Sequence, residues 1–221
     1  MLKRELDYSI RWKVIDGLHF VPQHRERVLI AGFAEEVAFD WGALRLPDKS
    51  RHRLAEVLHP EDCTERPEHP YTIGPRAAVD PRYTISGRLL RCPKGHAGRH
   101  RTAGNGFGYG LVNASGIART LSACYYKDGA EILVAKGKGR NPRRLTPREC
   151  ARLMGYPDSF RIPVSDTQVY RQVGNSVVVP LIQEVAWAMK PQIAKLLARK
   201  CGVAVRPLVG RSQRDRGGSR Q

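Results

Sequence analysis

The sequence predicts an α/β protein that also contains a smaller, irregular, β-containing domain. Two segments near the N-terminus, residues 11–16 and 27–33, have the composition of β-strands, and the second is apolar enough to lie inside a sheet. Residues 47–81 contain six prolines and are typical of a loop region. Apolar residues with helical periodicity return near the C-terminus. Together these observations indicate part of an α/β domain joined to a loop-rich domain.

The elements of the N-terminal half are expected to be short. Residues 2–8 have the composition of the end of a helix, and a short helix is predicted around Leu54. Residues 118–134 are expected to form two strands around a turn at residues 127–129. Two strands alone leave edges and one face uncovered, so the N-terminal pair is expected to belong to a larger sheet.

The clearest helix signal follows residue 145. Thr146 can cap a helix over residues 147–154, Glu149 can complete a capping box, and Gly155 can end the helix. This short helix has a small apolar face and an unusual number of arginines around it. They are Arg143, Arg144, Arg148 and Arg152.

Two more helices are predicted after the capped helix, at about residues 167–172 and 178–199. Pro191 is expected to kink or restart the second of them. Residues 206–221 contain five arginines, three glycines and almost nothing to bury, so they are expected to be disordered.

The charge of the chain points to a polyanionic partner. The 221 residues include 38 Lys and Arg against 21 Asp and Glu, for a net charge of +17. Residues 88–152 alone hold 14 basic and three acidic residues. A field of this sign attracts polyanions through counterion release, so nucleic acid is the leading partner. A merely solvated basic surface and a contact with anionic lipid are the alternatives.

Membrane and secretory classes are disfavoured. No run approaches the roughly 18 to 20 apolar residues of a membrane span. The basic N-terminus lacks the apolar stretch of a signal peptide. Five scattered cysteines indicate reduced thiols rather than a disulfide framework. We therefore expect a cytoplasmic protein associated with the nucleoid.

Three segments carry the most specific signal when they are taken in order. They are VPQHRERVLIAGF at residues 21–33, RRLTPRECARLMGYPDSF at residues 143–160 and YRQVGNSVVVPLIQEVA at residues 170–186. Together they resemble the last conserved blocks of the DNA cytosine-5 methyltransferases, and the bacterial CCWGG-type members most closely. The resemblance implies the C-terminal portion of a Rossmann-like, S-adenosylmethionine-dependent methyltransferase with an incomplete catalytic sheet.

The family's chemistry assigns roles to the first segment. A cytosine is flipped out of double-stranded DNA, a cysteine thiolate attacks C6, and C5 accepts the methyl group of S-adenosylmethionine. The resemblance implies that Arg27 reaches the flipped base and that Arg25 and Gln23 help to order the site. Alternate residues of an extended segment point the same way, so the three are expected to share one face. The alternative is a solvated strand end.

Further roles follow from the same resemblance. Residues Gly174, Asn175 and Ser176 are expected at the entry of the last helix, in the S-adenosylmethionine pocket, which this chain holds only in part. A plain turn is the alternative. The short helix is expected to support the recognition region, with its arginines at that interface, on phosphates or in solvent. The DNA-binding set is Arg101, Arg119, Thr120, Leu121, Lys127, Arg143 and Arg144.

Two other patterns are interpreted as coincidental. GNGFGYG at residues 104–110 resembles a nucleotide loop but does not lie between a strand and a helix. Cys92, His96 and His100 have ligand-like spacing, but a structural zinc needs four ligands and no second cysteine is close. No metal is therefore expected.

Departures from the family pattern limit the expected activity. None of the five cysteines follows a proline, as the family's nucleophile does, and the Phe-x-Gly-x-Gly cofactor loop is missing. We therefore expect no methylation by the chain alone and a separate N-terminal methyltransferase half as its partner. Three interpretations remain open: a subunit of a split enzyme, a fragment of a broken gene, and a stand-alone DNA-binding module.

The resemblance also implies a division of the chain. Residues 1–39 would end the catalytic domain, and residues 40–165 would form the target-recognition domain. Residues 166–200 would return to the catalytic domain, and residues 201–221 would be a basic tail.

Overall fold

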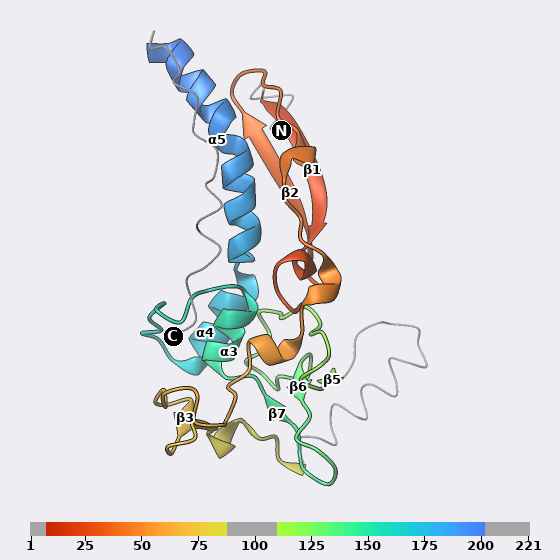
Figure 1. Ribbon diagram of the computed structural model, residues 1–221, viewed down its shortest axis with the longest axis vertical. Coiled ribbons are helices and arrows are strands. Elements are labelled where there is room, and N and C mark those ends of the chain that lie inside the picture. The colour runs from red at the N-terminus through yellow and green to blue at the C-terminus, as the bar shows by residue number, and fades with distance from the viewer. Residues whose placement is uncertain (1–7, 88–109, 202–221) are drawn as a thin grey trace, which may run out of the picture. The chain divides into compact units, whose positions relative to one another are not determined.

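The computed structural model describes residues 8–87 and 110–201 (Figure 1). Several expectations fall on other parts of the chain: the helix end before Tyr8, most of the GNGFGYG segment, the disordered tail and the site residue Arg101. The spaced residues Cys92, His96 and His100 also lie outside the described residues.

The chain divides into two compact units. Among the described residues, unit 1 comprises residues 8–12, 30–44 and 184–201, and unit 2 comprises residues 13–29, 45–87 and 110–183. Each unit is described by itself below.

Strands β1 (Ser9–Asp16) and β2 (Glu26–Phe33) pair in a two-stranded sheet. They confirm the strands predicted at residues 11–16 and 27–33, with extra residues at their starts. The carboxylate of Asp16 accepts a hydrogen bond from the Leu18 amide at 3.1 Å and begins the 3-10 turn η1 (Gly17–His19). An acidic side chain thus ends β1 by capping the next turn.

Unit 1 is built around a few aromatic residues. Phe33 and Phe39 pack with ring centroids 5.8 Å apart, and Phe39 meets Trp41 edge to face at 5.0 Å. Trp41 opens the 3-10 turn η2 (Trp41–Ala43). The side-chain amide of Gln192 donates to the Ala38 carbonyl at 3.0 Å and ties the C-terminal helix to this loop.

Unit 2 is rich in loops and contains two small sheets. Strands β3 (Thr72–Ile73) and β4 (Ala78–Val79) pair antiparallel. In the second sheet, β6 (Leu133–Val134) is parallel to β5 (Leu111–Val112) and antiparallel to β7 (Arg143–Arg144). Three 3-10 turns complete the segment: η3 (Lys49–Arg51), η4 (Leu54–Glu56) and η5 (Pro81–Tyr83). The helix predicted around Leu54 is thus a single turn.

The hairpin predicted within residues 118–134 was wrong. Residues 123–128 form turns, and β6 pairs with β5 and β7 instead. The reason is the fully buried Tyr125, whose hydroxyl donates to the Ile132 carbonyl at 2.7 Å and accepts from the Leu145 amide at 2.8 Å. One aromatic side chain therefore satisfies backbone groups that a strand ladder would have paired.

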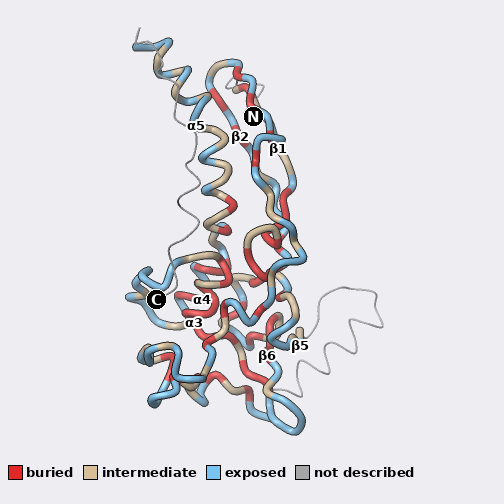
Figure 2. The backbone as a smooth tube through the Cα atoms, in the orientation of Figure 1, coloured by how far each residue is buried: buried red, intermediate tan, exposed pale blue. Residues whose placement is uncertain are grey.

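Helix α3 (Pro147–Leu153) begins as predicted. The Thr146 hydroxyl accepts from the Glu149 amide at 3.1 Å, and the Glu149 carboxylate accepts from the Thr146 amide at 2.8 Å. Gly155 follows the helix with φ of +80°, where a side chain would be strained. Figure 2 shows that α3 is almost wholly buried.

The last two helices are longer than predicted. Helix α4 spans Asp166–Asn175 and α5 spans Val179–Cys201, with Pro191 inside α5 rather than at a break. The Gly174–Ser176 segment does not open the last helix, as predicted, but ends α4. The Ser176 amide still donates to the Val173 carbonyl at 3.0 Å, so the chain leaves α4 before α5 begins. Among the described residues, no helix is long and apolar enough to cross a membrane.

Candidate functional site

The predicted site residues of unit 2 meet where two extended segments run side by side. The Ala118 amide donates to the Pro22 carbonyl at 2.9 Å, and the His24 amide donates to the Ala118 carbonyl at 3.0 Å. The Thr120 hydroxyl then donates to the His24 carbonyl at 2.6 Å. We call residues 118–122 the recognition segment, because Thr120 and Leu121 of the predicted DNA-binding set lie within it. These bonds hold the recognition segment against residues 23–27, which we call the Gln-x-Arg-x-Arg segment.

Gln23 is fully buried and binds the recognition segment directly. Its side-chain oxygen accepts from the Leu121 amide at 2.7 Å, and its nitrogen donates to the Leu153 carbonyl at 3.3 Å. The side chain therefore links the recognition segment to the end of α3, and each polar atom of the buried amide has a partner.

Arg25 is buried and makes the most far-reaching contacts of the site. Its guanidinium donates to the Leu121 carbonyl at 2.7 Å, to the Gly174 carbonyl at 2.8 Å and to the Ser176 carbonyl at 2.9 Å. The last two carbonyls lie at the C-terminal end of α4, where a cation is favoured. Burial, and then the charge of Arg27, lower the pKa of Arg25 to about 10, so it stays protonated at neutral pH.

Arg27 differs from the two residues before it. It is exposed, and its guanidinium donates to the Glu26 carbonyl at 2.7 Å. The three side chains that were expected to share one face thus differ in exposure: Gln23 and Arg25 are enclosed and Arg27 is open. The reason is that β2 begins at Glu26, and the two earlier residues are covered by the recognition segment.

Asp16 fixes the backbone of this region. Its carboxylate accepts from the Arg25 amide at 2.8 Å and from the side chains of His24 at 3.1 Å and Lys49 at 3.2 Å. Burial alone would raise the pKa of Asp16, but the hydrogen bonds lower it to about 2. The ionised carboxylate therefore anchors Arg25 through its main chain.

Gly174 lets the end of α4 touch the end of the recognition segment. A Cβ atom at Gly174 would lie 2.3 Å from the Ser122 carbonyl oxygen and 2.6 Å from the Ala123 nitrogen. Only glycine fits such an approach between two backbones. Asn175 is exposed beside it, and the Ser176 hydroxyl donates to the Val173 carbonyl at 2.9 Å.

The arginines around α3 form internal ion pairs. Arg143 is only 3 % exposed, and its guanidinium binds the buried Glu149 carboxylate through two bonds of 2.7 Å each. The same carboxylate accepts from the His59 amide at 2.9 Å. Arg143, which the sequence placed in the DNA-binding set, thus has its donors turned inward to Glu149.

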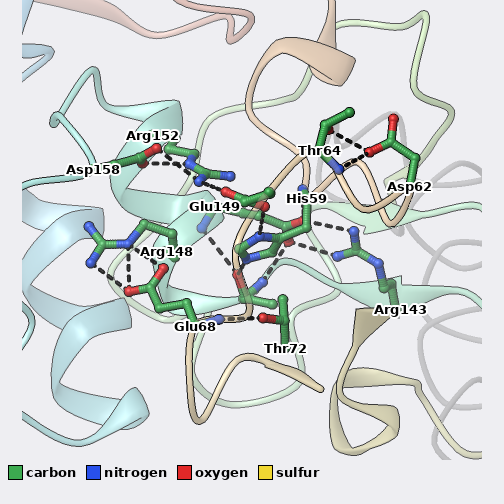
Figure 3. A network of polar contacts seen from close by, with 12 residues as sticks. His59, Asp62, Thr64, Glu68, Thr72, Arg143, Arg148, Glu149, Arg152 and Asp158 are labelled. Carbon is green, nitrogen blue, oxygen red and sulfur yellow. Dashed lines mark hydrogen bonds and ion pairs between the residues drawn. The ribbon is translucent and has the colours of Figure 1, made fainter. Parts of the chain in front are cut away.

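The network continues around α3 through residues that sequence reasoning missed (Figure 3). Arg148 binds the Glu68 carboxylate at 2.7 Å, and Arg152 binds Asp158 at 2.7 Å and also Glu65. The buried His59 ring lies between Glu65, at 2.7 Å, and the Thr146 hydroxyl, at 3.2 Å. Glu68 and Glu65 lie 80 and 87 residues before their arginines, so no local pattern predicts these two pairs, whereas Asp158 follows Arg152 by only six residues.

The remaining DNA-binding candidates differ in exposure. Leu121 is fully buried, with both backbone groups held by Gln23 and Arg25, so its side chain is turned away from solvent and its place in the DNA-binding set stays a prediction. Arg119 and Lys127 are exposed, whereas Thr120 and Arg144 are partly covered. The Arg144 guanidinium lies 5.4 Å from the centre of the Tyr170 ring. Among the described residues, no group of His, Cys, Asp or Glu could hold a metal ion.

Comparisons with known proteins agree on one family. The family model described as C-5 cytosine-specific DNA methylase matches residues 2–191. The chain is 42 % identical to the DNA-cytosine methyltransferase of Escherichia coli K12, covering 84 % of this chain and 42 % of that protein. It is 41 % identical to type II methyltransferase M.NlaX of Neisseria lactamica, covering 89 % of this chain and 57 % of that protein. The chain thus spans about half the length of the curated relatives it matches.

Comparison with solved structures shows which fold the chain has. The Dnmt2 methyltransferase of S. pombe aligns with a TM-score of 0.59 at 17 % identity, over 86 % of this chain and 61 % of that one. The EhMeth methyltransferase of Entamoeba histolytica aligns with a TM-score of 0.57 at 16 % identity, over 84 % of this chain and 54 % of that one.

Proposed function

Because the chain belongs to the C-5 cytosine-specific DNA methylase family, we propose that it is the target-recognition and C-terminal part of a DNA (cytosine-5) methyltransferase. The complete enzyme would transfer a methyl group from S-adenosylmethionine to C5 of a flipped cytosine in a short site. The observation that carries this proposal is the convergence on Arg25 of the Gln-x-Arg-x-Arg segment, the recognition segment and the end of α4.

Arg27 is the residue of this chain that would meet the flipped base. Its guanidinium is exposed while Arg25 beside it is enclosed, so it can present donors to the cytosine carbonyl without breaking the packing. The enclosed neighbour keeps its charge and adds to the positive field at the site. Arg27 would orient the base, and Arg25 would hold the backbone that carries Arg27.

The segment after Val173 fits only one side of a cofactor pocket. S-adenosylmethionine supplies the methyl group when it is bound. Asn175 offers an exposed amide, which can both donate and accept, but the carbonyls of Gly174 and Ser176 are already bound to Arg25. Asn175 would therefore hold one edge of the ligand, and other parts of the enzyme would hold the rest.

Exposed basic side chains near the recognition segment would bind double-stranded DNA. Arg119 and Lys127 are exposed, and Arg144 is partly so. Most protein–DNA hydrogen bonds go to the backbone, so phosphate contacts are the expected role for these three. The nearest resemblance makes CCWGG the first target sequence to test.

The nucleophile would come from a complementary N-terminal part. Cys150 is buried within α3, and burial raises the pKa of its thiol well above the ordinary value, so it would not form a thiolate there. None of the five cysteines follows a proline. The complementary part would carry the Pro-Cys block, on a separate polypeptide or in one longer chain. Reading the coding sequence upstream of the Met1 codon distinguishes these two arrangements.

Arg27→Ala tests the proposed role in the completed enzyme. We expect methyl transfer, measured with labelled S-adenosylmethionine, to fall at least a hundredfold, because a positioned donor at a developing charge contributes about 10²–10³ in rate. DNA affinity, measured by fluorescence anisotropy, should fall only a few-fold. The exposed Arg51 provides the control, and Arg51→Ala should change neither quantity. Equal losses of transfer and affinity in Arg27→Ala would reduce Arg27 to a phosphate contact.

A stand-alone DNA-binding module is the second candidate, and the fully buried core of unit 2 favours it. In that case the chain alone would be monomeric and would bind one duplex tightly in moderate salt. Binding to any duplex that weakens steeply with salt would exclude this candidate.

A further inference from the structure

We propose that Arg25 is a positioning residue that couples DNA recognition to the cofactor side of the enzyme. The inference rests on the proposed function, because it takes the recognition segment and the end of α4 as the two sites. It goes further by naming the physical connection between them. Binding at one site would then change the order at the other.

The geometry of the guanidinium supports this connection. One terminal nitrogen donates to the Leu121 carbonyl at 2.7 Å, and the other donates to the Gly174 and Ser176 carbonyls at 2.8 and 2.9 Å. These acceptors are about 50 residues apart in the sequence, and a single rigid planar group joins them. Movement of either segment would therefore leave a buried carbonyl without its donor.

The end of α4 and the recognition segment also touch directly, so neither can move independently of the other. The backbone of Gly174 approaches that of Ser122 so closely that an added Cβ would lie 2.3 Å from the Ser122 oxygen. A shift of the loop after Leu121 must therefore displace the end of α4 or open the contact. Packed elements of this kind change between discrete arrangements rather than deforming smoothly.

Gln23 provides a matched comparison within the same site. Its side-chain oxygen also accepts from the Leu121 amide, at 2.7 Å, but its side-chain nitrogen donates to the Leu153 carbonyl and the Met154 sulfur at the end of α3. Gln23 thus holds the recognition segment without reaching the end of α4. Loss of Gln23 should loosen the recognition segment, whereas loss of the Arg25 fork should separate it from α4.

Hydrogen–deuterium exchange of the chain with and without a CCWGG duplex at low salt tests the coupling. In the wild type, DNA should slow exchange in residues 118–123 and also, about tenfold, in residues 173–178, within the usual range of coupling between sites. In Arg25→Lys, which keeps the charge but loses the fork, protection should remain at 118–123 and disappear at 173–178. In Gln23→Leu, the remote protection should persist.

The outcomes separate the two proposals. Remote protection that persists in Arg25→Lys would overturn the coupling while leaving the proposed function intact.

If DNA slows exchange in neither segment of the wild type, the proposed DNA-recognition role fails. The coupling between the two segments is then tested by comparing variants in the absence of DNA. Gly174→Ala, which pushes α4 away from Ser122, should speed exchange at 121–123 in the wild-type background but not further in Arg25→Lys. Equal responses in both backgrounds would overturn the coupling. A cooperative melt of each variant confirms that it is folded.

Discussion

Unit 2 and unit 1 differ in how completely they bury their apolar residues. In unit 2, Leu145 and Leu153 are 0 % exposed, and the Arg143–Glu149 ion pair lies inside the fold. In unit 1, Trp12 is 66 % exposed and Leu197 is 57 % exposed. From Glu184 onward, no described residue of α5 is buried (Figure 2). Unit 2 therefore holds the more deeply buried core, although both units expose some large apolar side chains.

This difference in burial indicates where a further structural element would pack against the chain. Large exposed apolar side chains mark surfaces that another element covers. The chain spans about half the length of its curated relatives, so the proposed complementary part has the size to supply such an element. The comparison predicts that matched substitutions will destabilise unit 2 far more than unit 1.

The largest effect is expected from removing a buried carboxylate. Glu149→Ala leaves the buried Arg143 guanidinium without its partner, which should cost about 3–5 kcal/mol of stability. Glu36→Ala breaks the exposed pair with Arg11 in unit 1 and should cost less than about 1 kcal/mol. Urea unfolding followed by circular dichroism measures both. Similar losses of stability in the two variants would contradict the predicted difference between the units.

Leucine truncation sharpens the same contrast. Leu153→Ala opens a cavity in unit 2 and should lower the free energy of unfolding by about 2–5 kcal/mol. Leu197→Ala removes a side chain that already meets solvent, so a change within about 0.5 kcal/mol is expected. A loss of 2 kcal/mol or more for Leu197→Ala in the purified chain, about the value of a core truncation, would mean that Leu197 is packed in a core.

A glycine pair gives the third comparison. Gly174→Ala forces a Cβ against the Ser122 carbonyl, which should cost about 1–3 kcal/mol. Gly32→Ala places a Cβ 3.5 Å from the Tyr8 ring, an ordinary contact, and should be neutral or add up to about 1 kcal/mol of stability within a strand. Thermal melts of both variants check this order. Equal tolerance would show that α4 and the Ser122 loop separate readily.

The pH dependence of unit 2 should show the carboxylate of Asp16. Its pKa of about 2 in the folded chain lies below its ordinary value, so its stabilisation is present above the unfolded pKa and is lost as pH falls. Allowing for solvent screening, about 1–2 kcal/mol should disappear between about pH 4.5 and pH 2. Asp16→Asn should remove this part of the slope when unfolding is measured across that range. An unchanged slope would contradict the assigned anchoring role.

The smallest effect on stability is expected on the exposed strand surface of unit 1. Ile30→Thr keeps a β-branched side chain at a 59 % exposed position, so the free energy of unfolding should change by less than about 0.5 kcal/mol. Self-association of the isolated chain, measured by sedimentation velocity, should decrease. Unchanged self-association would show that this strand surface does not mediate the contact between copies of the chain.

Local signals predicted the parts of the fold that depend on neighbouring residues. The capping box of Thr146 and Glu149 predicted the start of α3, and the strand-like composition of residues 11–16 and 27–33 predicted β1 and β2. The family resemblance singled out Arg25, although alternation along the chain suggested a face shared with Arg27.

The remaining features depend on contacts between distant residues. Arg25 binds a carbonyl 149 positions away, and the His59 amide reaches a carboxylate 90 positions away. Tyr125 replaced a predicted hairpin with turns because its hydroxyl bonds the backbone of Ile132 and, 20 positions away, the backbone of Leu145. No periodicity encodes such pairs.

We propose that this chain recognises DNA and completes a methyltransferase whose nucleophile lies in a complementary N-terminal part. The most direct measurement is transfer of a labelled methyl group to CCWGG duplexes by three samples. These are the chain alone, the chain mixed with the part of the E. coli relative that it does not match, and the same mixture with Arg27→Ala. We predict no transfer by the chain alone, transfer by the mixture, and a loss of at least about a hundredfold with Arg27→Ala. Transfer by the chain alone, or a stable mixed complex without transfer, would contradict the claim.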